Sequence, residues 1–210
     1  MSTDPTQQFY ESHVREYEEQ TDNLQPQSFL QKFMETLPRN SRLLDVGCAY
    51  GRDSAFLAEH GFKVTGVDYA AGLIERAKQR VPNAEFLVAD MRELPFDSGS
   101  FDGIWAYMSL LHLQKSEVPA ALQGFAHVLA PQGVFALGMK VGQGEGYVTD
   151  QRYDGAKKYF ANFTENEMHG LLQQAGFHVL ESSVRERQLP YQDLPVMEIL
   201  ARKDSTASRS

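Results

Sequence analysis

The feature that most constrains the fold is a glycine-rich turn between two short apolar runs. Residues 43–46 form the first run, and the small residues 47–51 follow it, where a backbone can approach a ligand closely. A helical pattern comes next, and a second strand over residues 63–67 is closed by Asp68. A carboxylate roughly twenty residues beyond a glycine turn can accept hydrogen bonds from both hydroxyls of a ribose. This stretch therefore predicts one half of a nucleoside-binding site.

Strand and helix patterns alternate along the chain, and this alternation predicts the fold class. Strands joined by helices imply parallel neighbours with right-handed crossovers, and ligands bind beyond the carboxyl ends of such strands. We therefore expect an α/β fold: a doubly wound (Rossmann-like), mostly parallel seven-stranded sheet with helices on both faces and an antiparallel last strand. The predicted strands are residues 43–46, 63–67, 85–88, 101–106, 134–139, 177–184 and 196–201.

The chain reads as a single domain over residues 1–204, followed by a flexible tail over residues 205–210. Apolar residues at helical spacing predict an N-terminal helical cap over about residues 9–38. Regular patterning stops over about residues 141–163, and the aromatic content of this segment favours an ordered lid over a pocket. An exposed, mobile excursion is the alternative for the same segment.

Composition excludes several classes of function. The net charge is -8 without a cluster of Lys and Arg, so nucleic acid is an unlikely partner. No apolar run approaches the roughly 20 residues needed to cross a membrane, and the first residues lack the pattern of a secretory signal. We expect a cytoplasmic location, with which the single cysteine, Cys48, agrees. No metal site is predicted.

The residues around the turn distinguish between two kinds of nucleoside ligand. A dinucleotide site requires the pattern G-x-G-x-x-G, so that the pyrophosphate lies on the helix N-terminus. Here Asp45 precedes Gly47, and the next glycine is Gly51. An acidic residue at the strand end repels phosphates but suits a cationic amino group. S-adenosylmethionine has an ammonium group, a sulfonium and no phosphate, so the charges favour it over a dinucleotide.

Five segments in register then carry a resemblance to a known family. They read LLDVGCAYGRD, VTGVD, AEFLVADMRELPF, FDGIWAYMSLLHL and FAHVLAPQGVFAL. Residues 42–140 therefore resemble a class I S-adenosylmethionine-dependent methyltransferase, the group that includes small-molecule and quinone-biosynthesis methyltransferases. The resemblance implies S-adenosylmethionine as cofactor and S-adenosylhomocysteine as product.

The resemblance also assigns roles in cofactor binding. Asp45 would help to hold the ammonium group, Asp68 would bind the ribose hydroxyls, and Ala49 stands where the family more often has glycine. The complete set implied is the turn residues Asp45, Gly47, Cys48, Ala49 and Gly51, the nucleoside contacts Asp68, Tyr69, Asp90, Met91 and Tyr107, and the N-terminal tyrosines Tyr10 and Tyr17. A turn carboxylate without a ligand is the alternative for Asp90, and plain helix packing is the alternative for the two N-terminal tyrosines.

The acceptor side is less constrained. His112 and Tyr107 follow the fourth strand and are candidate catalytic residues, with ordinary packing as the alternative for His112. The lid residues Tyr147, Arg152, Tyr153 and Tyr159 favour a small-molecule acceptor that is apolar or aromatic. A methyltransferase acting on protein or RNA and a non-catalytic S-adenosylmethionine-binding module stay open as alternatives. The acceptor, the methylated atom, the use of a general base and the oligomeric state do not follow from the sequence.

Overall fold

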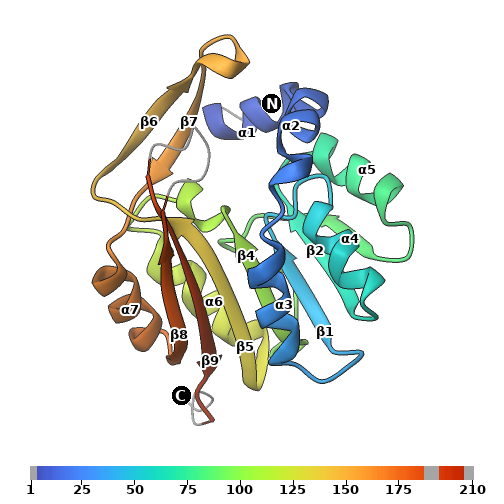
Figure 1. Ribbon diagram of the computed structural model, residues 1–210, viewed down its shortest axis with the longest axis vertical. Coiled ribbons are helices and arrows are strands. Elements are labelled where there is room, and N and C mark those ends of the chain that lie inside the picture. The colour runs from blue at the N-terminus through green and yellow to red at the C-terminus, as the bar shows by residue number, and fades with distance from the viewer. Residues whose placement is uncertain (1–3, 187–193, 206–210) are drawn as a thin grey trace.

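The computed structural model describes residues 4–186 and 194–205. Its main feature is a seven-stranded sheet in the order β3-β2-β1-β4-β5-β9-β8 (Figure 1). The first five strands of this order are parallel, and β9 is antiparallel to both β5 and β8, which confirms the predicted fold class. The strands are β1 (Arg42–Val46), β2 (Lys63–Asp68), β3 (Glu85–Val88), β4 (Phe101–Tyr107), β5 (Leu129–Lys140), β8 (Phe177–Arg185) and β9 (Val196–Lys203).

Successive residues of the central strands face two separate helical layers, because side chains alternate across a strand. Leu43 and Trp105 contact the layer formed by α3 (Gln27–Glu35) and α4 (Arg52–Glu59). Leu44 and Ile104 contact the opposite layer, formed by α6 (Val118–Val128) and α7 (Glu165–Gln174). The sheet is therefore buried on both faces, as the sequence predicts. None of the helices in the described part of the chain has the length and apolar composition of a membrane crossing.

The segment over residues 141–163 contains a β-hairpin, where the sequence shows no regular pattern. Strands β6 (Glu145–Asp150) and β7 (Ala156–Ala161) pair antiparallel, and a short 3-10 turn, η3 (Gln151–Tyr153), joins them. Strand β6 has no buried apolar face, since four of its six residues are exposed and the other two are only partly buried. Period-two patterning therefore could not reveal it.

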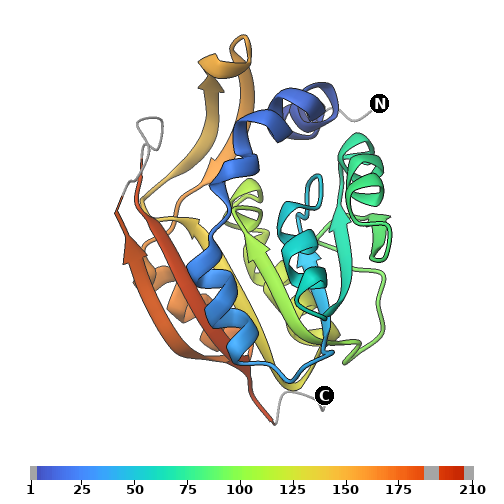
Figure 2. The ribbon, with the colours of Figure 1, turned by 45° about the vertical axis from the view of Figure 1, so that its right-hand side comes forward.

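The N-terminal helices lie beyond the same end of the sheet as this hairpin (Figures 1 and 2). Helix α1 (Pro5–Ser12) begins at Pro5 and not at residue 9, because Asp4 accepts a hydrogen bond from the Thr6 N–H at 2.8 Å and Pro5 suits the first helical turn. Helix α2 (Val14–Thr21) and a 3-10 turn, η1 (Asp22–Leu24), follow. The predicted tail lies outside the described residues from residue 206 onward.

The first helix is joined to α5 (Ala71–Arg80) by a carboxylate. Helix α5 has no side-chain cap of its own, since Ala70 occupies the capping position. Glu11 of α1 accepts hydrogen bonds from the N–H groups of Ala71 at 2.7 Å and Gly72 at 3.0 Å. An acidic group at a helix N-terminus satisfies otherwise unpaired N–H groups and interacts favourably with the helix dipole. Glu11 thus caps α5 from a different part of the chain.

Replacing Glu11 tests this contact. Glu11→Ala should lower the free energy of unfolding by about 1 kcal/mol, because two N–H groups of α5 lose their acceptor. Chemical denaturation measures the change. The exposed Glu19 of α2 provides a matched control, and Glu19→Ala should have little effect. Equal destabilisation by both variants would contradict the capping role.

Candidate functional site

Two adjoining cavities open at the carboxyl ends of the parallel strands. They measure about 190 Å³ and 340 Å³ and share Tyr10, Tyr17, Gly47, Ala49, Tyr107, Met108 and His112. Among the described residues, the charged groups of the smaller cavity are Asp4, Asp68, Asp90, Glu117 and Arg92. Those of the larger cavity are Arg52, Lys140, Arg152, Lys158, Arg185, Asp45 and Asp53. We call them the acidic cavity and the basic cavity.

Gly47 and Gly51 shape the turn for reasons of internal packing. Gly47 has φ 73°, and a Cβ there would lie 2.3 Å from the Cβ of Ser109. Gly51 has φ 80° at the start of α4, and its Cβ would lie 3.2 Å from the Cβ of Ala77. Both positions favour glycine, because L side chains rarely adopt this backbone region. Gly47 lines both cavities and Gly51 lines neither.

Ala49 occupies the same left-handed backbone region, with φ 49°. Its N–H donates to Asp68 Oδ2 at 3.0 Å, so this strained residue is held by the carboxylate that ends β2. A non-glycine residue in this region costs roughly 1–2 kcal/mol. The left-handed backbone at residue 49 thus explains why glycine would be preferred here, as the family resemblance implies.

Asp68 is buried, with an exposed fraction of 7%. Its second oxygen, Oδ1, accepts from the Ala70 N–H at 2.9 Å. Burial raises the pKa of Asp68 to about 6, although the hydrogen bonds from Ala70 and Ala49 oppose the rise. A carboxylate has about four acceptor positions, so both oxygens can accept further bonds from a ligand in the acidic cavity.

Asp45 lines the basic cavity beside the turn. It accepts a hydrogen bond from the Ser54 hydroxyl at 2.6 Å. Burial and the nearby charge of Asp53 raise the pKa of Asp45 to about 7. Asp53 itself accepts from Arg52 at 2.8 Å and from the Trp105 indole N–H at 3.1 Å. The charge of Asp45 is therefore destabilised in the free protein, and a nearby cationic group would stabilise it.

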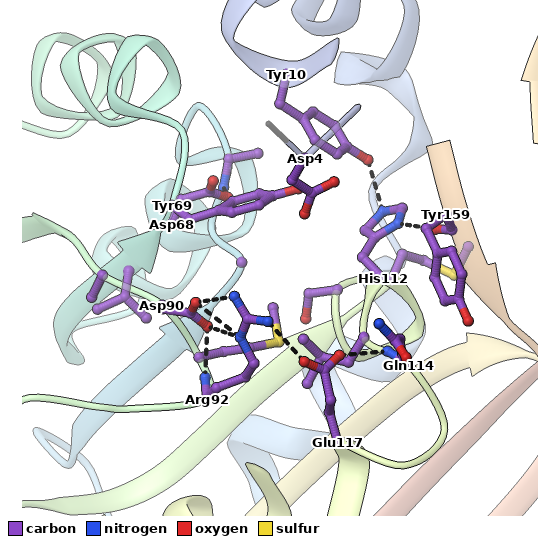
Figure 3. A pocket seen from close by; sticks show the side chains of 18 of the residues that line it. Asp4, Tyr10, Asp68, Tyr69, Asp90, Arg92, His112, Gln114, Glu117 and Tyr159 are labelled. Carbon is purple, nitrogen blue, oxygen red and sulfur yellow. Dashed lines mark hydrogen bonds and ion pairs between the residues drawn. The ribbon is translucent and has the colours of Figure 1, made fainter. Parts of the chain in front are cut away.

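Asp90 lies across the acidic cavity from His112 (Figure 3). It accepts from the Arg92 backbone N–H and from Arg92 Nε, each at 2.9 Å, and Arg92 also bonds Glu117 at 2.8 Å. Burial raises the pKa of Asp90, but the bonds from Arg92 outweigh this effect and hold the pKa below its usual value. Asp90 thus accepts the hydrogen bonds of a turn and also lines the acidic cavity with Met91, so its role toward a ligand stays a prediction.

His112 is held in one tautomer by its neighbours. It ends the short 3-10 turn η2 (Leu110–His112) after β4. Its Nδ1 lies 2.8 Å from the Tyr159 carbonyl oxygen, which can only accept, so Nδ1 carries the proton. Nε2 therefore accepts from the Tyr10 hydroxyl at 2.9 Å. Burial and the charges of Lys158 and Lys140 lower the pKa of His112 to about 4, so the ring is neutral near pH 7.

The Tyr107 hydroxyl belongs to a charged network at the edge of both cavities. It accepts a hydrogen bond from Arg185 Nη2 at 2.6 Å and donates to Glu198 Oε1 at 3.4 Å. Arg185 also pairs with Glu198 at 3.1 Å. The Tyr107 ring is stacked on Trp105, with 5.5 Å between the centroids. These contacts fix the position of Tyr107 on the rim of the basic cavity.

The predicted lid residues do not all line the same cavity. Tyr147 and Tyr159 line the acidic cavity, and Arg152 lines the basic cavity. Tyr153 lines neither, because its ring packs edge-on against Phe9 at 4.7 Å. Of the remaining predicted site residues, Gly51 lines neither cavity, and the others line at least one: Asp45, Gly47, Cys48, Ala49, Asp68, Tyr69, Asp90, Met91, Tyr107, His112, Tyr10 and Tyr17.

Several lining residues were not predicted from the sequence. Arg92 and Ser109 line the acidic cavity, and Lys140, Lys158 and Arg185 line the basic cavity. Arg92 follows Asp90 by two residues, a spacing that allows the observed turn contact. Lys140, Lys158 and Arg185 come from β5, β7 and β8, so no spacing along the chain predicts that they meet.

Two buried hydroxyls of the acidic cavity lack a protein partner. Tyr69 OH and Ser109 Oγ have no hydrogen-bond partner among the described residues. Buried hydroxyls are normally hydrogen-bonded, and leaving one unpaired costs roughly 1–3 kcal/mol. A ligand with polar groups would complete these bonds. With Asp68 in the same cavity, this arrangement fits a polar nucleoside better than a purely apolar ligand.

The backbone strain at Ala49 gives a direct test of the turn. Ala49→Gly should raise the free energy of unfolding by roughly 0.5–1 kcal/mol, since relief of the left-handed conformation exceeds the entropy that glycine adds to the unfolded chain. Ala55 lies within α4 and serves as the matched control. Ala55→Gly should lower the stability by about 1 kcal/mol. Destabilisation by both substitutions, measured by denaturation, would contradict the strain.

Comparison with known proteins gives a family match. Residues 43–133 match the model of the methyltransferase domain. An S-adenosyl-L-methionine-dependent Diels-Alderase of Talaromyces variabilis is 38% identical over 109 residues, which are 48% of this chain and 37% of that protein. The 2-methyl-6-phytyl-1,4-hydroquinone methyltransferase of Synechocystis sp. is 34% identical over 108 residues, 50% of this chain and 33% of that protein. The chain thus spans less than half the length of these two relatives.

Solved structures share the fold. The Burkholderia thailandensis 1,6-didemethyltoxoflavin-N1-methyltransferase, with bound 1,6-didemethyltoxoflavin and S-adenosylhomocysteine, matches with a TM-score of 0.70 and 24% identity. The match covers 93% of this chain and 87% of that chain. The domain match, the strand order and the glycine turn agree with the resemblance seen in the sequence. Residues 43–133 of this chain thus match the methyltransferase domain, and the chain shares the fold of the 1,6-didemethyltoxoflavin-N1-methyltransferase.

Proposed function

We propose that the protein binds the nucleoside part of S-adenosylmethionine in the acidic cavity and its methionine part beside the glycine turn, and transfers the methyl group to a small molecule in the rest of the basic cavity. The observation that carries the proposal is the meeting of the two cavities at Gly47, Ala49, Tyr107 and His112. One cavity has the carboxylate and unpaired hydroxyls suited to a nucleoside, and the other is large enough for a second molecule. Their common boundary would place donor and acceptor side by side.

Named residues would hold the cofactor. Asp68 would accept the ribose hydroxyls, and Tyr69 and Met91 would contact the adenine. Asp45, whose pKa burial raises to about 7, would be stabilised as a carboxylate by the ammonium group of the methionine part. Gly47 and Ala49 line both cavities. The backbone of the turn would therefore lie between the ribose at Asp68 and the ammonium group at Asp45.

S-adenosylmethionine, when bound, supplies a methyl group on a sulfonium whose sulfur leaves as a neutral thioether. The protein's contribution is mainly alignment and the exclusion of water, and proximity alone can lower the barrier by about 7–11 kcal/mol. Tyr10 and Tyr17 of the N-terminal helices and Tyr147 and Tyr159 of the hairpin would exclude water, because all four line the acidic cavity. The neutral His112, with Nε2 as acceptor, would take a proton from an acceptor hydroxyl, either directly or through Tyr10.

A small acceptor agrees with the enclosure of the site. Helix α1 contacts the hairpin above the cavities, where the Tyr159 N–H donates to Thr6 Oγ1 at 2.9 Å. A cavity of about 340 Å³ suits a small ring system better than a folded protein or RNA. The similar proteins include methyltransferases that are named for a hydroquinone and for 1,6-didemethyltoxoflavin. A cytoplasmic location stays a prediction.

Catalysis of a Diels-Alder reaction is a second candidate function, because one relative is an S-adenosyl-L-methionine-dependent Diels-Alderase. In such a role the protein would bind the cofactor, but the reaction in its name would not be methyl transfer. Binding of S-adenosylmethionine alone therefore does not distinguish the two functions. Release of S-adenosylhomocysteine does, because it requires loss of the methyl group.

Cofactor binding is tested by calorimetric titration with S-adenosylmethionine and with NAD. Only the first should bind, and Asp68→Asn should weaken its binding by about 1–3 kcal/mol, because charged hydrogen bonds to the ribose are lost. Asp102 lies at the start of β4, where it pairs with Arg42 at 3.3 Å, and Asp102→Asn is the control. Unchanged affinity in Asp68→Asn would show that the ribose binds elsewhere, and binding of NAD alone would overturn the cofactor assignment.

Catalysis is tested by the release of S-adenosylhomocysteine with fractions of a cell extract as the source of acceptor. His112→Ala should lower the maximal rate by about 10²–10⁴-fold if His112 is the general base, with little change in cofactor affinity. Because the pKa of His112 is lowered to about 4, its ring stays neutral, and the wild-type rate at saturating cofactor should not decline between pH 8 and pH 6. Equal maximal rates of wild type and variant would remove His112 from the reaction.

A further inference from the structure

The basic cavity has a charge opposite to that of the whole chain. The chain has a net charge of -8. Among the described residues, five cationic side chains and two carboxylates line this cavity, whereas four carboxylates and one guanidinium line the acidic cavity. Carboxylates placed behind the lining, such as Asp150 and Glu198, pair with some of these cations. The basic cavity is nevertheless the place where positive charge is concentrated next to the transfer site.

On the hairpin, the Asp150 carboxylate pairs with two cations. Asp150 accepts from Arg152 Nη2 at 2.7 Å and from Lys158 Nζ at 3.0 Å. Lys158 is buried, with an exposed fraction of 5%, and its ammonium lies 4.2 Å from the centroid of the Phe9 ring. Burial lowers the pKa of Lys158, and the positive charges of Arg152 and Lys140 lower it further, while Asp150 opposes the change. An additional anion would relieve this repulsion.

The other cations approach from different strands. The ammonium of Lys140, on β5, lies 4.3 Å from the centroid of the Phe160 ring. Arg185, on β8, donates to the Tyr107 hydroxyl at 2.6 Å and pairs with Glu198. Aromatic rings therefore accompany the cations, and a flat molecule with an anionic substituent would meet both. Arg52 is the first residue of α4, directly after the glycine turn, and it pairs with Asp53 at 2.8 Å.

We propose that the methyl acceptor is an anionic small molecule, an aromatic or other planar compound bearing a carboxylate or phosphate, held by Lys140, Lys158, Arg152 and Arg185. The proposal rests on the proposed function for the assignment of the basic cavity to the acceptor. The carboxylate of the cofactor does not account for these cations, because they come from β5, β7, η3 and β8 and not from the turn at residues 47–51. Arg52, next to that turn, is the cation placed to meet the cofactor's carboxylate.

Matched probes test the acceptor class without knowledge of the acceptor. Benzoate, phenyl phosphate and neutral benzamide are titrated into the protein saturated with S-adenosylhomocysteine, so that the cofactor's own carboxylate site is filled. At least one anion should bind about tenfold or more tightly than benzamide, and its affinity should fall with added salt. The anion that binds more tightly identifies carboxylate or phosphate as the preferred group.

Two lysine variants distinguish binding in the basic cavity from an effect of general surface charge. Lys140→Gln should weaken anion binding about tenfold and leave benzamide unaffected, since one charged contact is lost. Lys157 precedes Lys158 on β7, is exposed and does not line either cavity, so Lys157→Gln should leave anion binding unchanged. Equal binding of benzamide and both anions, no binding of either anion, or equal losses in the two variants would overturn the proposal.

The same experiment distinguishes this proposal from the proposed function. Failure of the wild-type protein to bind S-adenosylhomocysteine would count against the proposed function itself. Normal binding of S-adenosylhomocysteine without a preference for anions would overturn only the anionic acceptor. Retained S-adenosylhomocysteine affinity in Lys140→Gln shows that this variant is folded.

Discussion

The two hydrogen bonds to the Asp68 carboxylate hold the site together. One comes from the strained Ala49 of the turn after β1, and the other comes from Ala70 at the start of α5. The carboxylate thus joins the end of β2 to both segments that frame the acidic cavity. Its burial and raised pKa show that this arrangement is costly to the free protein. A ligand that donates hydrogen bonds to Asp68 would therefore stabilise a carboxylate that burial destabilises in the free protein.

The parallel part of the sheet and the turn could be predicted from the sequence, because each element buries a face and leaves a local pattern. The hairpin could not, since β6 is largely exposed and pairs only with β7. The same distinction applies to the site. Asp68 and Asp90 follow directly from their places at strand ends, whereas Lys140, Lys158 and Arg185 meet only when β5, β7 and β8 are assembled. Tyr153 shows the reverse case, as its aromatic ring is used for packing against Phe9.

The division of charge between the two cavities would link the proposed cofactor and acceptor sides of the site. His112 lies on their boundary, and the positive charges of Lys158 and Lys140 help to keep its ring neutral. A neutral ring with an unprotonated nitrogen, which here accepts from the Tyr10 hydroxyl, is the form needed to take a proton. The basic residues would thus serve the acceptor twice, by attracting an anion and by keeping the nearby base deprotonated.

The bond between Thr6 and Tyr159 joins residues that are 153 positions apart. During synthesis, the first helix therefore leaves the ribosome long before the strand on which it docks. Contacts of such high sequence separation form late, because a long loop must close first. The wall that α1 contributes to the acidic cavity can be completed only after the hairpin has been made, so the parallel sheet can form before its active site is closed.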